Sequence, residues 1–237
     1  MTFNEIIESI PQKPYYLDLE YGQVIYCADN RDILKFIPDK SIDLVLTDPP
    51  YGVSFKKKGE PYMIGDHINP LPWLYPVLYK ILKDDGAIFV FSSMSYVTES
   101  LLPFQTFFKL HNIIIWDKIN PIYPRSKGHF RLQYEPILYG SKGLHNLKSK
   151  KSGDIIQCKI PRGKERCHPT QKPTELLMTI LKSTLDTKDL ILDPFLGSGT
   201  TAVCAKKLGR KCIGIEISEA YCSIAAQRLS QSVMVLK

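Results

Sequence analysis

The residues of this 237-residue chain most suited to chemistry are four in a row, Asp48-Pro49-Pro50-Tyr51, one residue after the apolar run 41–46. The two prolines fix the backbone φ angle, remove two backbone donors and favour extended conformations in the residues before them. The stretch predicts a stiff loop at a strand end, with the Asp48 carboxylate and the Pro49 carbonyl held as acceptors. A loop that holds a flat ligand and an ordinary sharp turn are both compatible with it.

A second stretch, 190–209, combines an apolar run, a loop with two glycines and the start of a helix. Gly197 and Gly199 let the backbone approach a ligand closely, and a helix N-terminus offers free N–H groups. Nineteen residues after Gly197 comes Glu216, an acid that can accept hydrogen bonds from both hydroxyls of a ribose. The order of strand, loop, helix, strand and acid predicts nucleoside binding in preference to a plain strand–helix–strand turn.

The residue before this loop favours one kind of nucleoside. Asp193 places a carboxylate beside the glycine turn, where it would repel the pyrophosphate of a dinucleotide. The loop also departs from the GxGxxG spacing of dinucleotide-binding motifs. A cationic ligand is favoured instead, and S-adenosylmethionine, which carries sulfonium and ammonium charges, meets this requirement.

The formal net charge of +7 is concentrated in one segment. Between residues 142 and 166 there are eight basic and two acidic residues, so that eight minus two gives +6 for this stretch alone. A second basic cluster, 56–58, follows the proline loop directly. A solvated loop and a surface that contacts phosphates are both compatible with the longer segment, and the second cluster favours phosphate contact.

The composition, with 44% hydrophobic and 23% charged residues, is that of a soluble globular protein. The sequence has no apolar run of membrane-spanning length and no signal-peptide pattern at residues 1–16, so we expect a cytoplasmic location. A metal site at Cys158, Cys167 and His168 is not predicted, because their spacing does not fit a zinc motif. Several of the six cysteines lie in apolar runs without a CxxC pair, which predicts free thiols at Cys27, Cys158, Cys167, Cys204, Cys212 and Cys222.

The elements that position these residues alternate between strands and helices. Short apolar runs predict strands at 23–27, 41–48, 87–93, 112–118, 135–143, 189–193 and 211–217. Helical patterns are found at 30–39, 71–86, 95–108, 173–185, 199–209 and 218–231, the second of them ending at Gly86. Alternation of this kind, with strands that are apolar throughout, is typical of a mostly parallel sheet covered by helices on both faces. Residues 1–22 carry no motif.

Taken together, these motifs resemble the β-type, permuted DNA amino-methyltransferases. DPPY (48–51) matches the catalytic motif of that family and DPFLGSGT (193–200) its S-adenosylmethionine motif, with the catalytic motif first in the chain. HPTQKP (168–173) matches the motif before the cofactor strand, and 112–138 resembles the middle block, with its Trp-x-Lys and its Glu-x-Ile-Leu. The similarity covers roughly residues 23–230.

The resemblance implies a Rossmann-like α/β methyltransferase fold over 1–237 as a single catalytic domain, with a mostly parallel seven-stranded sheet and one antiparallel edge strand. It also implies how S-adenosylmethionine is bound. Asp29 would meet the adenine of the cofactor, Glu216 would hold its ribose hydroxyls, and Asp48 would lie close by. The residues implied near its methionine and ribose are His168, Thr170, Asp193, Phe195, Gly197, Ser198, Gly199 and Thr200.

The proline loop would then act as a clamp for a target base. An exocyclic amino group is a poor nucleophile because its lone pair is delocalised into the ring. If the Asp48 carboxylate and the Pro49 carbonyl accept its two N–H bonds, the lone pair becomes available, and Pro50 helps to keep both acceptors in place. Tyr51 would stack on a base turned out of the duplex. Methyl transfer would be direct, without a metal or a covalent enzyme intermediate.

The aspartate of the clamp favours adenine N6, so we expect a site-specific DNA adenine methyltransferase. An enzyme acting on cytosine N4 or on RNA, and a non-catalytic nucleic-acid-binding module, remain alternatives. The expected partner is double-stranded DNA, with the basic segment 140–167 as the target-recognition region; a homodimer and a cognate restriction endonuclease are also compatible with the resemblance. The expected phosphate contacts are Lys56, Lys57, Lys58, Lys148, Lys150, Lys151, Arg162 and Lys164.

Overall fold

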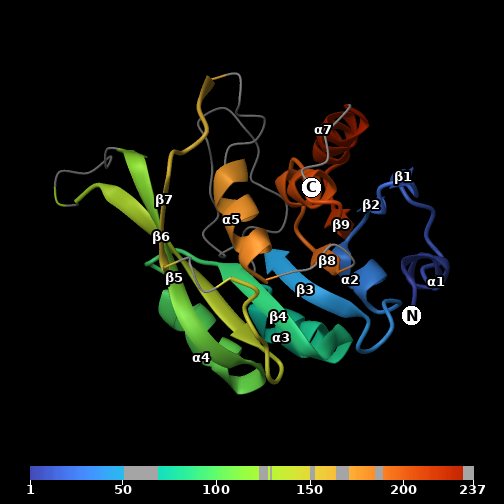
Figure 1. The fold of residues 1–237 in the computed structure, drawn as a ribbon, viewed down its shortest axis with the longest axis horizontal. Coiled ribbons are helices and arrows are strands. Elements are labelled where there is room, and N and C mark those ends of the chain that lie inside the picture. Colours follow the sequence, from blue (N-terminus) through green and yellow to red (C-terminus); the bar gives the residue numbers. More distant parts are fainter. Residues whose placement is uncertain are drawn as a thin grey trace.

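The computed structural model describes residues 1–50, 69–122, 128, 130–149, 153–163, 171–184 and 189–231. Within these residues nine strands form one sheet in the order β1-β2-β9-β8-β3-β4-β6-β5-β7 (Figure 1). The strands are β1 (Tyr16–Asp18), β2 (Gln23–Cys27), β3 (Ile42–Thr47), β4 (Leu82–Phe91), β5 (Lys109–Ile122), β6 (Leu132–Ser141), β7 (Ile155–Cys158), β8 (Leu190–Asp193) and β9 (Lys211–Glu216).

The sheet is mostly parallel, as the sequence predicts, but the prediction of seven strands with one antiparallel strand at an edge is wrong. Nine strands are present in the described part of the chain, and two of them run against the rest. Strand β1 is antiparallel to β2 at one edge, whereas β6 is antiparallel to both β4 and β5 inside the sheet. The additional strands β1 and β7 are short, and most of their side chains are exposed or half-buried, so neither has a continuous apolar run.

Helices cover both faces of the sheet, which confirms the predicted architecture. Helices α5, α6 and α7 pack on one face and α1, α2, α3 and α4 on the other. Alternating residues of the strands contribute to the two cores: in β3, Leu44 and Leu46 belong to the first core, and Val45 to the second. The helices are α1 (Phe3–Glu8), α2 (Asn30–Leu34), α3 (Leu71–Ile81), α4 (Val97–Phe107), α5 (Thr174–Thr184), α6 (Thr200–Lys207) and α7 (Glu219–Ser230).

The helix predicted over 71–86 is shorter in the structure, and Gly86 does not end it. Helix α3 stops at Ile81, and β4 begins at the next residue. Residues 83–86 form an irregular part of β4, because Ile42 pairs with Leu82 whereas Leu44 pairs with Ala87. A Cβ atom on Gly86 would lie 2.7 Å from Cγ of Leu82, so glycine serves close packing within the strand. The helical spacing of apolar residues continued past the true helix end.

The first 22 residues, for which no structure was predicted, form α1 and β1. Phe3 and Ile6 of α1 are buried in the core on that face of the sheet. Strand β1 is held by the Asp18 carboxylate, which lies 2.9 Å from Nζ of Lys206 in α6. The same ammonium group donates a hydrogen bond of 2.7 Å to the carbonyl of Leu229 in α7. The N-terminal extension is therefore fixed to the two helices that follow the glycine loop.

The basic segment also contains an element that was not predicted. Ile155–Cys158 forms β7, which pairs in parallel with β5 at the end of the sheet. The five cysteines in the described ranges are free thiols, in agreement with the prediction; Cys167 lies outside those ranges. Across the same ranges, no group of three metal-ligating side chains is found, and no helix has the length and apolarity needed to cross a membrane.

Candidate active site

Four acidic side chains follow four neighbouring strands at one edge of the sheet. Glu216 ends β9 and Asp193 ends β8, while Asp29 and Asp48 come shortly after β2 and β3. These strands are adjacent in the order β2-β9-β8-β3 and run in parallel. Because their carboxyl ends meet at the same edge, the sheet assembles four of the predicted site residues there, which is where open α/β sheets bind ligands.

The glycine loop after β8 has an unusual backbone conformation at both of its glycines. Gly197 and Gly199 have positive φ angles of 55° and 82°, which L side chains rarely adopt. A Cβ atom on Gly199, the residue before α6, would lie 2.7 Å from Cβ of Ala225 in α7. Leu196 donates a backbone hydrogen bond of 2.9 Å to Ile215 in β9. The loop therefore packs closely against α7 and β9, and its two glycines have backbone conformations that other residues rarely adopt.

Two residues that the sequence did not suggest hold this loop from the side. Arg228 in α7 donates from Nη1 to the Ser198 carbonyl at 2.5 Å and to Oγ1 of Thr200 at 3.3 Å. Asn30, the first residue of α2, donates from Nδ2 to the Pro194 carbonyl at 3.0 Å. Asn30 directly follows Asp29, but its contact spans 164 positions of the chain. Local sequence patterns cannot reveal such a contact.

The Glu216 carboxylate faces the same loop. Its Oε2 accepts the Gly197 N–H at 2.8 Å, and its Oε1 accepts the Ser218 N–H at 2.8 Å. Burial raises the pKa of Glu216, and the backbone donors at Gly197 and Ser218 oppose that rise. Each carboxylate oxygen has a further lone pair, so the oriented side chain can still accept hydrogen bonds from a pair of hydroxyls.

Asp193 is the most deeply buried acid of the site, with 4% of its surface exposed. It accepts a hydrogen bond of 2.6 Å from Oγ1 of Thr201 and one of 3.1 Å from the Phe195 N–H. Burial raises the pKa of Asp193 to about 7; the two hydrogen bonds oppose the rise, and the charge of Asp48 adds to it. A positive charge placed nearby would favour the ionised form of this side chain.

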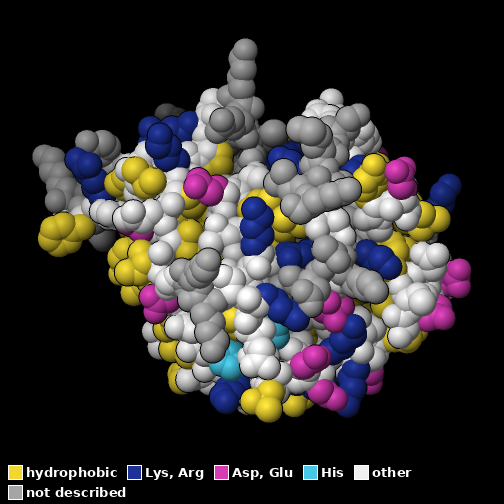
Figure 2. All heavy atoms as spheres, viewed as in Figure 1, with side chains coloured by type: hydrophobic (Ala, Val, Ile, Leu, Met, Phe, Trp, Pro, Cys, Tyr) yellow, Lys and Arg dark blue, Asp and Glu magenta, His cyan; other side chains and the backbone are white. Residues whose placement is uncertain are grey.

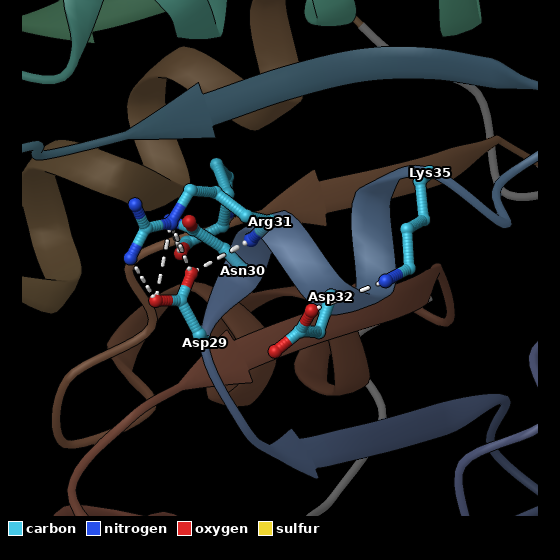
Figure 3. Close-up of polar contacts among 6 residues, drawn as sticks. Asp29, Asn30, Arg31, Asp32 and Lys35 are labelled. Carbon is cyan, nitrogen blue, oxygen red and sulfur yellow. Dashed lines mark hydrogen bonds and ion pairs between the residues drawn. The ribbon is translucent and has the colours of Figure 1, made fainter.

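Asp29 begins the helix after β2 (Figure 3). Its carboxylate caps α2 by accepting the Arg31 N–H at 2.9 Å, and it forms an ion pair of 2.5 Å with the Arg31 guanidinium. The hydrogen bond from that side chain lowers the pKa of Asp29. The backbone of Ala28 donates to the Glu216 carbonyl at 3.0 Å, which brings Asp29 beside the end of β9.

Asp48 contacts a buried lysine from the stretch before α5. Nζ of Lys172 lies 2.9 Å from Oδ2 of Asp48 and 3.0 Å from Oε2 of Glu135. The ammonium group is also 4.9 Å from the centre of the Phe91 ring, close enough for a cation–π interaction. Burial by itself would lower the pKa of Lys172, but the charges of Asp48 and Glu135 raise it well above its usual value.

The charged contacts continue across the sheet. Nζ of Lys118 in β5 lies 2.7 Å from Oε1 of Glu135 in β6 and 5.2 Å from the ring centre of Trp116. The Trp116 indole donates a hydrogen bond of 3.1 Å to the Cys158 carbonyl in β7. Burial by itself would raise the pKa of Glu135, but the charges of Lys172 and Lys118 hold it below its usual value. These residues fall within motifs that the sequence identified, although no role was predicted for them.

Two basic residues of the predicted DNA-contact set lie in the described ranges, Lys148 and Arg162, and they contact different parts of the fold. The Lys148 N–H donates to the Ser183 carbonyl near the end of α5, about 14 Å along the helix axis from its first residue, Thr174. Arg162 donates from Nη2 to the Asn120 carbonyl at 3.0 Å, two residues beyond Lys118. Figure 2 shows Lys and Arg side chains spread among other residues on this face. The following predicted site residues lie outside the described ranges: Tyr51, Lys56, Lys57, Lys58, Lys150, Lys151, Lys164, His168 and Thr170.

Comparison with known proteins gives the family. Residues 42–227 match the model of the N6/N4 DNA methylases, so this chain belongs to the DNA methylase family. It is 31% identical to the type II methyltransferase M2.LlaDCHI of Lactococcus lactis subsp. cremoris, over 92% of this chain and 93% of that protein. It is 28% identical to the DNA adenine methyltransferase YhdJ of Escherichia coli K12, over 88% and 83% of the two chains. The crystal structure of the M1.HpyAVI–SAM complex superposes with a TM-score of 0.73 and 27% identity, covering 88% of this chain and 100% of that one.

Proposed function

We propose that this protein is a site-specific DNA methyltransferase that uses S-adenosylmethionine to methylate the N6 amino group of adenine in double-stranded DNA. The observation that carries the proposal is the placement of Asp48 and Asp193 after the adjacent strands β3 and β8, with the glycine loop directly behind Asp193. An acceptor for an amino group thereby lies beside a loop suited to a cationic nucleoside.

The donor site fits S-adenosylmethionine in charge and in shape. Asp193 is buried with a pKa of about 7, so a positively charged ligand would shift it to the ionised form and be bound more tightly in return. Glu216 is oriented toward the loop and retains acceptor capacity for ribose hydroxyls. When bound, S-adenosylmethionine supplies an electrophilic methyl group attached to a positively charged sulfur.

The remaining cofactor contacts are proposed from the motifs. Asp29, beside the end of β9, is proposed to meet the adenine, and Phe195, which belongs to the same loop as the glycines, is proposed as a further contact. Ser198 and Thr200 are held in position by Arg228, which contacts both. His168 and Thr170 are proposed for the methionine end on the basis of their motif alone.

The acceptor side of the reaction rests on the proline loop. The Asp48 carboxylate and the Pro49 carbonyl accept the two N–H bonds of the target amino group, which frees its lone pair for attack on the methyl carbon. As the N–C bond forms, the methyl–sulfur bond breaks, and the amino group then gives up one proton to Asp48 or to water. Tyr51 is proposed to stack on the base after it has turned out of the duplex.

The choice of adenine and of duplex DNA is supported by the relatives and by charge. The relative from Escherichia coli is named a DNA adenine methyltransferase, and M2.LlaDCHI is named a type II methyltransferase. From these names we infer a restriction–modification setting with a cognate endonuclease. From the family resemblance we also infer a permuted motif order and a homodimer. Segment 140–167, in which Arg162 contacts the Asn120 carbonyl two residues beyond Lys118, is proposed to contact the phosphate backbone.

Product analysis tests this function directly. Duplex DNA is incubated with the purified protein and a tritiated methyl donor, digested to nucleosides and examined by mass spectrometry. We expect N6-methyldeoxyadenosine, whereas N4-methyldeoxycytidine, or label found only in RNA, would overturn the choice of substrate. As a control, Asp48→Ala should remove methyl transfer while calorimetry still detects S-adenosylmethionine binding; turnover within a few-fold of wild type would overturn the clamp.

A further inference from the structure

Arg31 in α2 lies at the edge of the sheet where S-adenosylmethionine is proposed to bind (Figure 3). The residues just before it contact the ends of other strands. The Ala28 N–H donates to the Glu216 carbonyl at 3.0 Å. Nδ2 of Asn30 donates to the Pro194 carbonyl, also at 3.0 Å. The start of α2 is therefore fixed between the end of β9 and the loop that follows β8.

The Asp29 carboxylate is occupied by Arg31. Oδ1 of Asp29 accepts the backbone N–H of Arg31 at 2.9 Å and its Nε–H at 3.0 Å. Oδ2 accepts the same Nε–H at 3.2 Å and an Nη2–H at 2.5 Å. A carboxylate has about four lone-pair positions, two on each oxygen. Each oxygen of Asp29 thus already accepts two hydrogen bonds from the same neighbour.

An adenine amino group would have to displace the guanidinium in order to reach this carboxylate. The amino group is neutral, whereas the guanidinium is charged and donates through two nitrogens at once, a geometry that adds both energy and orientation. The adenine end of S-adenosylmethionine carries no charge, so it could not replace the positive charge beside Asp29. The arrangement therefore disfavours direct recognition of the 6-amino group by this carboxylate.

The guanidinium of Arg31 keeps a flat surface available. Its side chain is 67% exposed, and Nη1 has no hydrogen-bond partner among the described residues. Guanidinium groups are planar and weakly hydrated, and they stack on aromatic rings. Because the contact with Asp29 holds the side chain in place, less conformational freedom is lost when a ring packs against it. The unused N–H groups are donors, as is the 6-amino group, so contact with the face of an adenine ring is favoured over contact with that edge.

We propose that Arg31 is a specificity-determining residue of the cofactor site, which covers the Asp29 carboxylate and presents the face of its guanidinium to the adenine ring. Asp29 then contributes to this part of the site by holding Arg31. Stacking on a ring face is tolerant of the groups at the ring edge. The site should therefore accept a 6-oxo purine about as well as adenine. This inference rests on the proposed function.

Calorimetry with two analogues of the reaction product tests this specificity without turnover. The ligands are S-adenosylhomocysteine and its 6-oxo analogue, S-inosylhomocysteine. Wild type should bind the two with affinities within about threefold of each other. If Asp29 accepted the amino group instead, the 6-oxo compound would place an acceptor against a carboxylate. It should then bind about tenfold more weakly or worse.

The variant Arg31→Ala isolates the contribution of the guanidinium. Alanine favours helix, and the backbone N–H of residue 31 still bonds to Asp29, so α2 should keep its cap. Affinity for the inosyl compound should fall by about fivefold or more, because the stacking surface is lost. Affinity for the adenosyl compound should fall less, because the freed carboxylate can accept its amino group. Lys35→Ala, which removes an exposed cation paired with Asp32 at 3.1 Å at the other end of α2, is the matched control and should bind both compounds like wild type.

The measured preferences distinguish the possible roles. A wild-type preference for the adenosyl compound above about threefold would show that Asp29 reads the amino group, and one for the inosyl compound would show that Arg31 donates to the purine edge; either overturns the face contact. If Arg31→Ala binds the inosyl compound as tightly as wild type, Arg31 does not touch the purine and serves only as an ion-pair partner. If wild type binds neither compound, the cofactor of the proposed function is wrong and the inference falls with it, whereas binding with the wrong preference leaves the proposed function standing.

Discussion

The protonation of Asp193 gives the most direct physical test of the site. This side chain is 4% exposed, and burial raises its pKa from 3.8 to about 7, with a smaller addition from the charge of Asp48. Its pKa is thus higher in the folded than in the unfolded chain. The folded state holds the proton more tightly, so the contribution to stability is complete below about pH 3.8 and is lost as the pH rises through 7.

The substitution Asp193→Asn removes this titration and keeps the shape of the side chain. As the pH rises from about 5 to about 8, through the folded-state pKa of about 7, ionisation of Asp193 should cost the wild-type protein about 3 kcal/mol of unfolding free energy. The amide also weakens the hydrogen bonds from Thr201 and Phe195, a loss of about 1–2 kcal/mol that does not depend on pH. The free energy of unfolding of Asp193→Asn should therefore increase relative to that of the wild type as the pH rises.

Urea and thermal unfolding without cofactor, near pH 5 and near pH 8, measure this shift. The difference in melting temperature between variant and wild type should change by roughly 6–12 °C between the two conditions. Asp84→Asn, at a side chain 68% exposed, serves as the control, and its difference from wild type should be the same at both pH values. If the difference in melting temperature between Asp193→Asn and wild type is the same at both pH values, burial does not raise the pKa of Asp193.

The same side chain should control cofactor affinity. Ionised Asp193 attracts the positive charge of S-adenosylmethionine, so calorimetry should show tighter binding by wild type near pH 8 than near pH 5. Asp193→Asn should lose this pH dependence and bind more weakly at the higher pH. Equal affinities for the two proteins near pH 8 would show that Asp193 does not face the cationic part of the ligand.

Three further predictions concern the surroundings of the site. Gly199→Ala forces a side chain onto a residue with a φ angle of 82° and should cost about 2–4 kcal/mol of unfolding free energy in urea titrations, together with cofactor affinity. Asp18→Asn leaves Lys206 without its ion-pair partner at 2.9 Å and should cost about 3 kcal/mol in the same titrations, while calorimetry shows unchanged cofactor affinity. Arg162→Ala should reduce the magnitude of the slope of log affinity for DNA against log salt concentration by about one. Lys148→Ala, beside the end of α5, should change this slope less. Equal changes in the two variants would disprove a larger role for Arg162 in phosphate contact.

The sequence by itself determined the elements whose causes are local. Apolar runs placed β2, β3, β8 and β9, and Gly197 and Gly199 marked the loop that follows β8. The acids Asp193 and Glu216 followed from their positions at strand ends. Where a pattern continued past its element, as at Gly86, the sequence misplaced the boundary, because the next residues were paired by the sheet.

Only the tertiary structure decided which distant residues meet. Strands β1 and β7 have no continuous apolar run to mark them in the sequence, and they exist because β2 and β5 supply their hydrogen-bond partners. The contacts of Lys172 with Asp48 and Glu135 depend on the order β3-β4-β6 in the sheet, which places the ends of separate segments side by side. Sequence patterns report short-range backbone preferences and burial, whereas a buried ion pair depends on which strands become neighbours, and that is fixed only when the whole sheet has formed.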